Sequence, residues 1–138
     1  MRSATAGLLL AAAVVLAACA RGRESTTSIG QSFDTSKLGA PVYPRAQPNE
    51  QGAVSATTSK GTTLMVGFKT ADAFDKVYAY YKAELPPGSE RLKIDAANGS
   101  VATFQIGDGN ATDRVSVQLT QSRPGETDIL ITRLTKGG

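Results

Sequence analysis

The sequence predicts an α+β fold, in which a single antiparallel sheet of about five or six strands is covered on one face by one helix. Two observations favour this fold. Residues 74–85 form the one window whose apolar residues recur at the 3.6-residue period of a helix. The segments around it alternate apolar and polar residues, as half-buried strands do, and turn signals such as Asn98-Gly99 and Pro124-Gly125 separate them. The expected order is therefore β-β-α-β-β-β-β in two layers.

The composition fits one small domain with additional segments and argues against several classes of function. Of the 138 residues, 41% are hydrophobic and 20% are charged. The net charge of +3 comes from 15 basic and 12 acidic residues that are scattered, whereas nucleic-acid binding needs a concentrated basic patch. The chain has no His, and Cys19 is its one Cys, which argues against Cys/His metal sites and His-dependent catalysis. We expect no nucleic acid, no metal, no cofactor and no enzymatic activity.

Residues 1–18 have the features of a signal peptide for export. Arg2 supplies a positive start, and the apolar run 7–18 is shorter than the about 20 residues that span a membrane. The run ends in Leu16-Ala17-Ala18-Cys19, which resembles the lipobox of bacterial lipoproteins. The resemblance implies a thioether-linked diacylglycerol on Cys19, cleavage before it and, in many bacteria, a fatty acid such as palmitate on the new amine. The alternatives are an ordinary signal peptide that ends near a Cys, or an uncleaved anchor.

A lipidated Cys19 would hold the protein on the exported side of the membrane, in the bacterial cell envelope. Two or three acyl chains anchor a protein stably, whereas one chain alone binds only marginally. In bacteria with two membranes, lipoproteins that carry Asp after the Cys stay in the inner membrane. Here that position is Ala20, so the outer membrane is the expected destination if the host has two membranes.

Residues 19–40 are expected to form the lipidated Cys and a flexible tether, followed by a single domain at residues 41–138. The tether is rich in Ser, Thr, Gly and charged residues. Its large apolar residues are isolated and too few to offset the entropy of ordering the chain; they are Ile29, Phe33 and Leu38.

The domain begins with an extended segment, Pro41-Val42-Tyr43-Pro44, because each Pro disfavours helix at its own position and at the residue before it. Residues 47–52 have the composition of a turn. Residues 53–59 and 62–69 are expected to form a hairpin around Lys60-Gly61. One face of the second strand carries Leu64, Val66 and Phe68.

The predicted helix follows this hairpin at once and is expected to be the only cover on the sheet. Thr70 or Asp72 is the expected N-cap, and Asp75 lies in the first turn, where the helix dipole favours a carboxylate. Pro86-Pro87-Gly88 ends the helix. Its apolar stripe consists of Phe74, Val77, Tyr78, Tyr81 and Leu85.

The C-terminal part is expected to be a meander with strands at residues 91–95, 101–106, 113–122 and 127–134. The side chains predicted to face the helix are Leu92, Ile94, Ala102, Phe104, Ile106, Val115, Val117, Leu119, Ile129 and Ile131. The opposite positions form an open polar face, since one helix covers only one side of a sheet. That face is the candidate interaction site, and it consists of Thr103, Gln105, Ser116, Gln118, Thr120 and Thr132.

Between about residues 41 and 134 the chain also resembles a known group of proteins. The resemblance rests on Pro41-Val42-Tyr43-Pro44-x-Ala46 and on the pattern F-x-T-x-D-x-x-D-K-V-x-x-Y-Y-K-x-x-L-P that begins at Phe68. Both look like a loose group of small bacterial lipoproteins and secreted domains that share a YPGA-like opening, one helix of this pattern and a following β-meander. Arg45 stands where that group often has Gly, and Ser89 stands where it often has an aromatic residue. The resemblance implies the fold and the exported location, and it implies no activity.

These features lead to one main hypothesis of function and two alternatives. The main hypothesis is a non-catalytic envelope lipoprotein whose domain contacts another envelope component, a protein or a glycan, through the open polar face or an edge strand. Tyr43 and Tyr80 either add an aromatic patch to that contact or are core rings with wet hydroxyls. The first alternative is a periplasmic or extracellular inhibitor or ligand-binding module that uses the loop from Gly107 to Thr112. The second is a hydrolase that acts through paired carboxylates.

Overall fold

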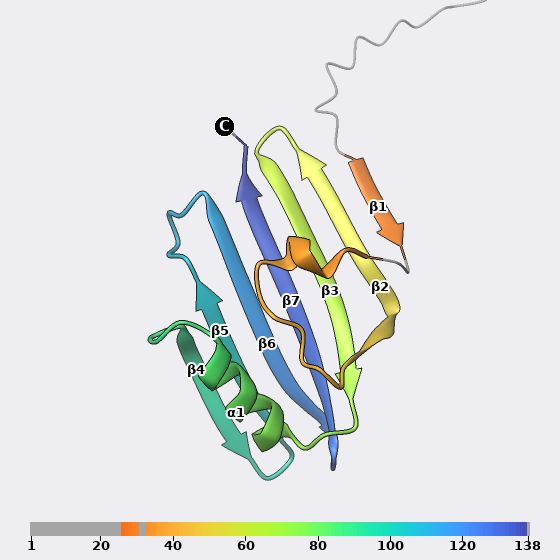
Figure 1. The fold of residues 1–138 in the computed structure, drawn as a ribbon, viewed down its shortest axis with the longest axis vertical. Helices are drawn as coiled ribbons and strands as arrows, with labels where there is room; N and C mark the ends of the chain where they lie inside the picture. The colour runs from red at the N-terminus through yellow and green to blue at the C-terminus, as the bar shows by residue number, and fades with distance from the viewer. Residues whose placement is uncertain (1–25, 31–32, 138) are drawn as a thin grey trace, which may run out of the picture.

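One antiparallel sheet organises the fold (Figure 1). The computed structural model describes the backbone of residues 26–30 and the whole of residues 33–137. Within these residues, seven strands pair in the order β1-β2-β3-β7-β6-β5-β4. The elements are β1 (Thr26–Gly30), the 3₁₀ helix η1 (Thr35–Leu38), β2 (Gln47–Thr58), β3 (Gly61–Thr70), α1 (Phe74–Glu84), β4 (Glu90–Ala96), β5 (Gly99–Ile106), β6 (Asp113–Arg123) and β7 (Glu126–Lys136). From β2 onwards the order is β-β-α-β-β-β-β, so the predicted α+β fold is confirmed, and β1 is an additional edge strand.

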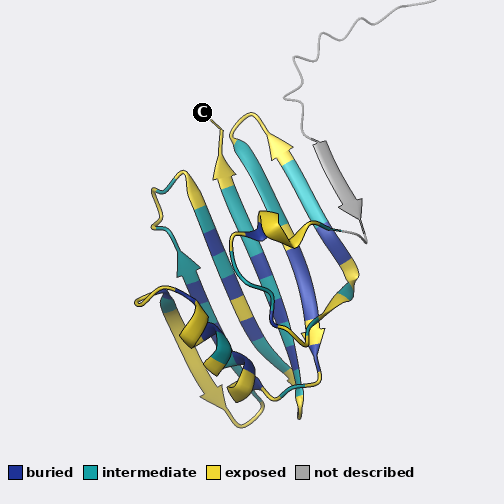
Figure 2. Cartoon of the chain, in the orientation of Figure 1, coloured by how far each residue is buried: buried dark blue, intermediate teal, exposed yellow. Residues whose placement is uncertain are grey.

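Buried residues alternate with less buried ones along the central strands (Figure 2), and the buried ones form the core together with α1. The helix stripe is confirmed, because Phe74, Val77, Tyr81 and Leu85 are buried and Tyr78 packs against the core. The strands bury Val66, Phe68, Ala102, Phe104, Val115, Val117, Leu119, Ile129 and Ile131, as the alternation predicts. All four Phe and all four Tyr of the chain lie in this core or pack against it. The aromatic rings are therefore gathered on the side of the sheet that α1 covers.

The helix begins differently from the prediction, which placed the N-cap at Thr70 or Asp72. Ala73 is the N-cap, and it makes no side-chain cap hydrogen bond. The Asp72 carboxylate instead accepts a hydrogen bond from Tyr43, and the Thr70 hydroxyl accepts one from the Asp72 N–H. The Asp72 side chain, which could otherwise cap the helix, is therefore engaged by Tyr43 from a distant part of the chain.

The prediction of a flexible tether as far as residue 40 is wrong for residues 26–30 and 33–40. β1 pairs along β2, and residues 33–46 cross the same face of the sheet as α1 (Figure 1). Leu38, at the end of η1, is 0% exposed, and the Lys37 carbonyl accepts a hydrogen bond from Arg133 Nη1 at 2.8 Å. A few apolar side chains suffice here because they bury on a sheet that is already formed. This segment covers the part of the inner face that α1 does not reach, so the helix is not the only cover.

The side chains of β4 point to the opposite face from the predicted one. Leu92 and Ile94, predicted to face the helix, are 45% and 50% exposed. The pairing of β4 with β5 shifts between Glu90 and Leu92, so that Leu92 lies opposite Thr103 and Ile94 opposite Val101. A shift of one residue turns every side chain of a strand to the other face of the sheet. Both apolar side chains therefore lie on the face away from α1.

The segment predicted to be a turn before residue 53 is the first part of β2. The pairing register with β3 shifts between Pro48 and Ala53, so the residues between them bulge out of the ladder. The Asn49 side chain folds over Gly67 of β3, where an added Cβ would lie 2.2 Å from Asn49 Nδ2. Gly67 therefore leaves the room that the bulge requires.

Candidate functional site

The face of the sheet away from α1 is the candidate interaction surface and is called the open face below. The strand pairing places Thr103 opposite Gln118. It also places Ser116 between Gln105 and Thr132. Paired residues of antiparallel strands project to the same side, and the alternate residues of these strands are buried on the other side. The residues predicted for this face therefore lie together on it; they are Thr103, Gln105, Ser116, Gln118, Thr120 and Thr132.

No described element covers the open face. Helix α1 packs against β5, β6 and β7, and η1 packs against β7, both on the inner face (Figure 1). Gln118 is exposed, and the other predicted residues of the face are half-buried by their neighbours. The hydroxyl and amide groups of these residues are thus available to a partner, except for Gln105 Nε2, which donates a hydrogen bond to the Gly107 carbonyl at 2.8 Å.

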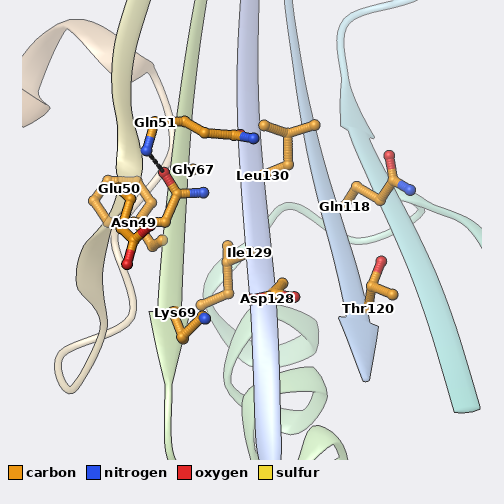
Figure 3. Close-up of a pocket in the computed structure, with 11 residues that line it drawn as sticks. Asn49, Glu50, Gln51, Gly67, Lys69, Gln118, Thr120, Asp128, Ile129 and Leu130 are labelled. Atoms are coloured by element: carbon orange, nitrogen blue, oxygen red, sulfur yellow. Dashed lines mark hydrogen bonds between the residues drawn. The ribbon is translucent and has the colours of Figure 1, made fainter. Parts of the chain in front are cut away.

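A hollow of about 460 Å³ opens on this face between the β2 bulge and strands β3, β7 and β6 (Figure 3). Asn49 forms its wall, and the Asn49 Oδ1 accepts a hydrogen bond from the Gln51 N–H at 3.1 Å. The floor runs from Gly67 through Leu130 to Gln118, which are paired across the three strands. Further polar groups around the hollow come from Glu50, Lys69, Thr120 and Asp128. This mixture of amide, hydroxyl and charged groups around one leucine can hydrogen-bond a polar surface in many geometries.

The open face is less polar than the sequence predicts. Met65 is 40% exposed and lies opposite Val54 of β2. At the other side of the sheet, Leu92, Ile94 and Val101 come together through the pairing of β4 with β5. Along the open face, the polar residues of β6 thus lie between apolar side chains on β3 and apolar side chains on β4 and β5. The place of Met65 on the open face could have been predicted from the sequence, because Met65 alternates with inward-facing residues of its strand. The place of Leu92 and Ile94 could not, because it depends on the shifted pairing register of β4.

On the covered side, Asp72 joins the N-terminal segment to the helix. The Tyr43 hydroxyl donates a hydrogen bond to Asp72 Oδ2 at 2.7 Å. Arg45 and Lys76 approach Asp72 Oδ1 at 3.3 and 3.4 Å. The Tyr43 hydrogen bond foremost, with the two cations, holds the pKa of the Asp72 carboxyl below its usual range. Burial and the same hydrogen bond raise the pKa of Tyr43 to about 12.

Tyr43 and Tyr80 do not form an exposed aromatic patch. Tyr43 is 5% exposed, and Tyr80 packs edge-on against it with ring centroids 5.2 Å apart. The Tyr80 hydroxyl lies 3.4 Å from the Val42 carbonyl, to which it donates a hydrogen bond. These rings fasten the Pro41-Val42-Tyr43-Pro44 segment to the helix, which gives that motif a structural role.

We predict that Asp72→Asn makes the stability of the domain less dependent on pH in the acid range. The folded pKa of Asp72 lies below the unfolded value of 3.8. Its contribution to stability is therefore complete above the unfolded value and is lost as the pH falls through the folded value. Urea unfolding at a series of pH values between about 2 and 6 measures the difference between wild type and variant.

Glu84→Gln is the matched control for this experiment, because Glu84 is exposed and no hydrogen-bond partner of its side chain is seen among residues 33–137. Its unfolding curve should keep the acid dependence of the wild type. If Asp72→Asn also keeps that dependence, the Tyr43–Asp72 contact does not contribute to stability as described.

Asp72 and Glu90 are both engaged by basic side chains. Glu90 accepts hydrogen bonds from Lys82 and from the Tyr78 hydroxyl, and the Lys82 contact foremost lowers the pKa of Glu90. A catalytic acid needs a raised pKa instead. Within the part of the chain that the structure describes, no group of three His, Cys, Asp or Glu side chains is placed to hold a metal ion.

The loop between β5 and β6, proposed above as an inhibitory loop, is a compact turn with an exposed tip. Asp108 Oδ1 accepts a hydrogen bond from the Asn110 N–H at 2.8 Å. The Asn110 carbonyl accepts one from Lys136 Nζ at 3.2 Å, which ties the loop to the end of β7. Gly107 has a φ of 82°, a conformation that favours glycine. Several oxygen atoms of the loop thus accept hydrogen bonds from the loop itself and from its neighbours Gln105 and Lys136.

The expected lipidation site, Cys19, lies outside the described residues, as does the expected signal peptide. No helix in the described ranges is long and apolar enough to cross a membrane. No family model, curated protein or solved structure matches the chain. The open face, its hollow and the lipobox-like segment are therefore the features from which a function can be inferred.

Proposed function

We propose that this protein is a non-catalytic lipoprotein of the bacterial cell envelope that uses the open face of its sheet to contact another envelope protein. The observation that carries the proposal is the hollow of about 460 Å³ on a face that no described element covers. Uncovered faces are common in antiparallel sheets. A merely solvated face, however, needs neither the β2 bulge that shapes the hollow nor exposed side chains such as Met65 and Ile94.

A protein fits the open face better than a glycan does. Protein interfaces combine apolar contacts with dispersed hydrogen bonds. Met65 and Leu130 offer apolar contacts. Thr103 and Gln118 offer hydrogen bonds and carry no charge that binding would have to desolvate. A sugar ring packs well on the flat apolar surface of an aromatic side chain, and all the Phe and Tyr rings lie on the other side of the sheet.

The anchor would be the lipid on Cys19, and it would hold the domain close to the membrane. Residues 20–25 separate Cys19 from β1, which begins at Thr26. Fully extended, this stretch spans no more than about 25 Å. The open face would therefore meet partners at the membrane surface rather than far from it.

The absence of catalysis is part of the proposal. The chain has no His, and hydrogen bonds with basic or tyrosyl partners lower the pKa of Asp72 and Glu90. Neither carboxylate has the raised pKa of a general acid.

We predict that Gln118→Lys combined with Thr103→Lys abolishes the cross-links between this protein and its partner. The two residues lie opposite each other at the centre of the open face, so the double change places two like charges in the proposed interface. Charges that an interface buries without counter-charges weaken binding strongly. Both positions contact solvent in the free protein, so the melting temperature should change little. Chemical cross-linking in intact cells, followed by identification of the captured partner, measures the effect.

The matched control is Ala79→Lys combined with Ala83→Lys, which adds the same two charges to the exposed side of α1. This variant should keep the cross-links. If the open-face variant also keeps them, the open face is not the binding surface. If the helix variant loses them as well, net charge rather than the open face governs the contact.

The exposed loop tip supports the inhibitor alternative, in which Asp108, Gly109 and Asn110 would enter a cleft of a partner. Replacing Asp108 and Asn110 by Ala separates the two hypotheses. Cross-links should survive this change if the open face makes the contact. They should be lost if the loop makes it.

A further inference from the structure

Strand β4 forms an edge of the sheet along which no described strand pairs. Its outer edge presents unpaired backbone N–H and C=O groups, which are a template for another strand. On the open face this strand carries Leu92 and Ile94, which are 45% and 50% exposed. Almost the whole strand is exposed in Figure 2. A free backbone edge and two large exposed apolar side chains thus occur on the same short strand.

The sequence of β4 is complementary to itself when two copies run antiparallel. With the two Ile94 residues opposite each other, Lys93 lies opposite the partner's Asp95, and Leu92 lies opposite the partner's Ala96. Opposite charges and apolar side chains placed directly across neighbouring strands stabilise their pairing. Within one copy, Lys93 Nζ lies 2.9 Å from Asp95 Oδ2, so the two charged side chains are on the same face and can meet their counterparts there.

The two neighbouring registers bring like charges together. Pairing centred on Lys93 places the two Lys93 side chains opposite each other. Pairing centred on Asp95 places the two Asp95 side chains opposite each other. Like charges in directly opposite positions destabilise a strand pair. The register centred on Ile94 avoids both conflicts.

We propose that two copies of this chain associate through β4 in the register centred on Ile94, so that one sheet continues across both copies. The two copies are related by a two-fold axis normal to the sheet, as in an isologous dimer. Because open-face residues of one β4 lie opposite open-face residues of the other, both open faces point to the same side. The dimer thus presents a surface of twice the width. The inference stands on β4 alone and does not depend on the partner proposed above.

Cysteine cross-linking tests the register directly. The full-length chain with Cys19→Ser has no Cys, so one engineered Cys reports one contact. Ile94→Cys places the two thiols opposite each other, at a Cα separation within the range of a disulfide. Oxidation of the purified protein should give a disulfide-linked dimer, and the untreated protein should show a dimer mass in light scattering.

Leu92→Cys is the matched control, because Leu92 lies on the same strand and face and has a similar exposure. In the proposed register its thiol is opposite the partner's Ala96 and cannot reach the other thiol. Equal disulfide formation by Ile94→Cys and Leu92→Cys would overturn the proposal, as would a monomer mass of the untreated protein.

Charge reversal provides the second test. Added to Ile94→Cys, Asp95→Lys places a Lys opposite the partner's Lys93 at two symmetric positions and should lower the amount of dimer by about tenfold. Lys93→Asp in addition restores opposite charges within and between the copies, and should restore the dimer. An undiminished dimer with Asp95→Lys, or no recovery with the second change, contradicts the proposed pairing.

Discussion

Tyr81→Ala should lower the free energy of unfolding by about 3–5 kcal/mol, as truncation of a fully buried aromatic ring does. Tyr81 is 0% exposed and lies at the centre of the helix stripe. Its ring packs against Phe104 and Tyr80, with centroids 6.3 and 5.2 Å away. Because a domain of this size is stable by only about 5–15 kcal/mol, the variant should be largely unfolded or melt far below the wild type. Urea unfolding followed by circular dichroism measures the effect.

Tyr81→Phe separates the ring from the hydroxyl and is the matched control. The Tyr81 hydroxyl accepts a hydrogen bond from the Tyr43 N–H at 3.3 Å, and burial raises the pKa of Tyr81. Loss of this one bond should cost about 1 kcal/mol, so the variant should fold. If Tyr81→Ala melts as the wild type does, the stripe of α1 is not the core of the domain.

Cys19→Ser should release the protein from membranes almost completely. Ser cannot form the thioether that the lipobox-like segment Leu16-Ala17-Ala18-Cys19 implies, so the mature chain would lack its acyl chains. Each buried methylene of such a chain contributes about 0.8 kcal/mol to membrane binding, so loss of the acyl chains removes the proposed anchor. Flotation of membranes from cells that express each variant measures the distribution.

Ala20→Ser is the matched control, since it makes a similar change at the next residue and leaves the thiol in place. This variant should float with membranes as the wild type does. Equal membrane fractions for Cys19→Ser and the wild type would show that the anchor lies elsewhere.

Local patterns in the sequence determined the order of the elements from β2 onwards, the buried stripe of α1 and the inward residues of β3, β5, β6 and β7. The period of apolar residues is a property of a single helix or strand, so it can be read without knowing its neighbours. The residues of the open face, such as Gln118, followed from the same alternation. The hollow did not follow, although Gly67 inside a strand pattern was a sign of a bulge.

Only the tertiary structure decided the features that depend on how one segment meets another. A one-residue shift before Leu92 turned the apolar side chains of β4 outward, and no local pattern encodes the pairing register of an edge strand. The composition of the N-terminal segment predicted a flexible tether. Leu38 of this segment is nevertheless buried, because it packs into the core on the inner face of the folded sheet. The Asp72 carboxylate accepts a hydrogen bond from Tyr43, which comes from a distant part of the chain, and does not cap the helix. In each case contacts between distant residues outweigh a local preference of about 1 kcal/mol, and such contacts exist only in the folded chain.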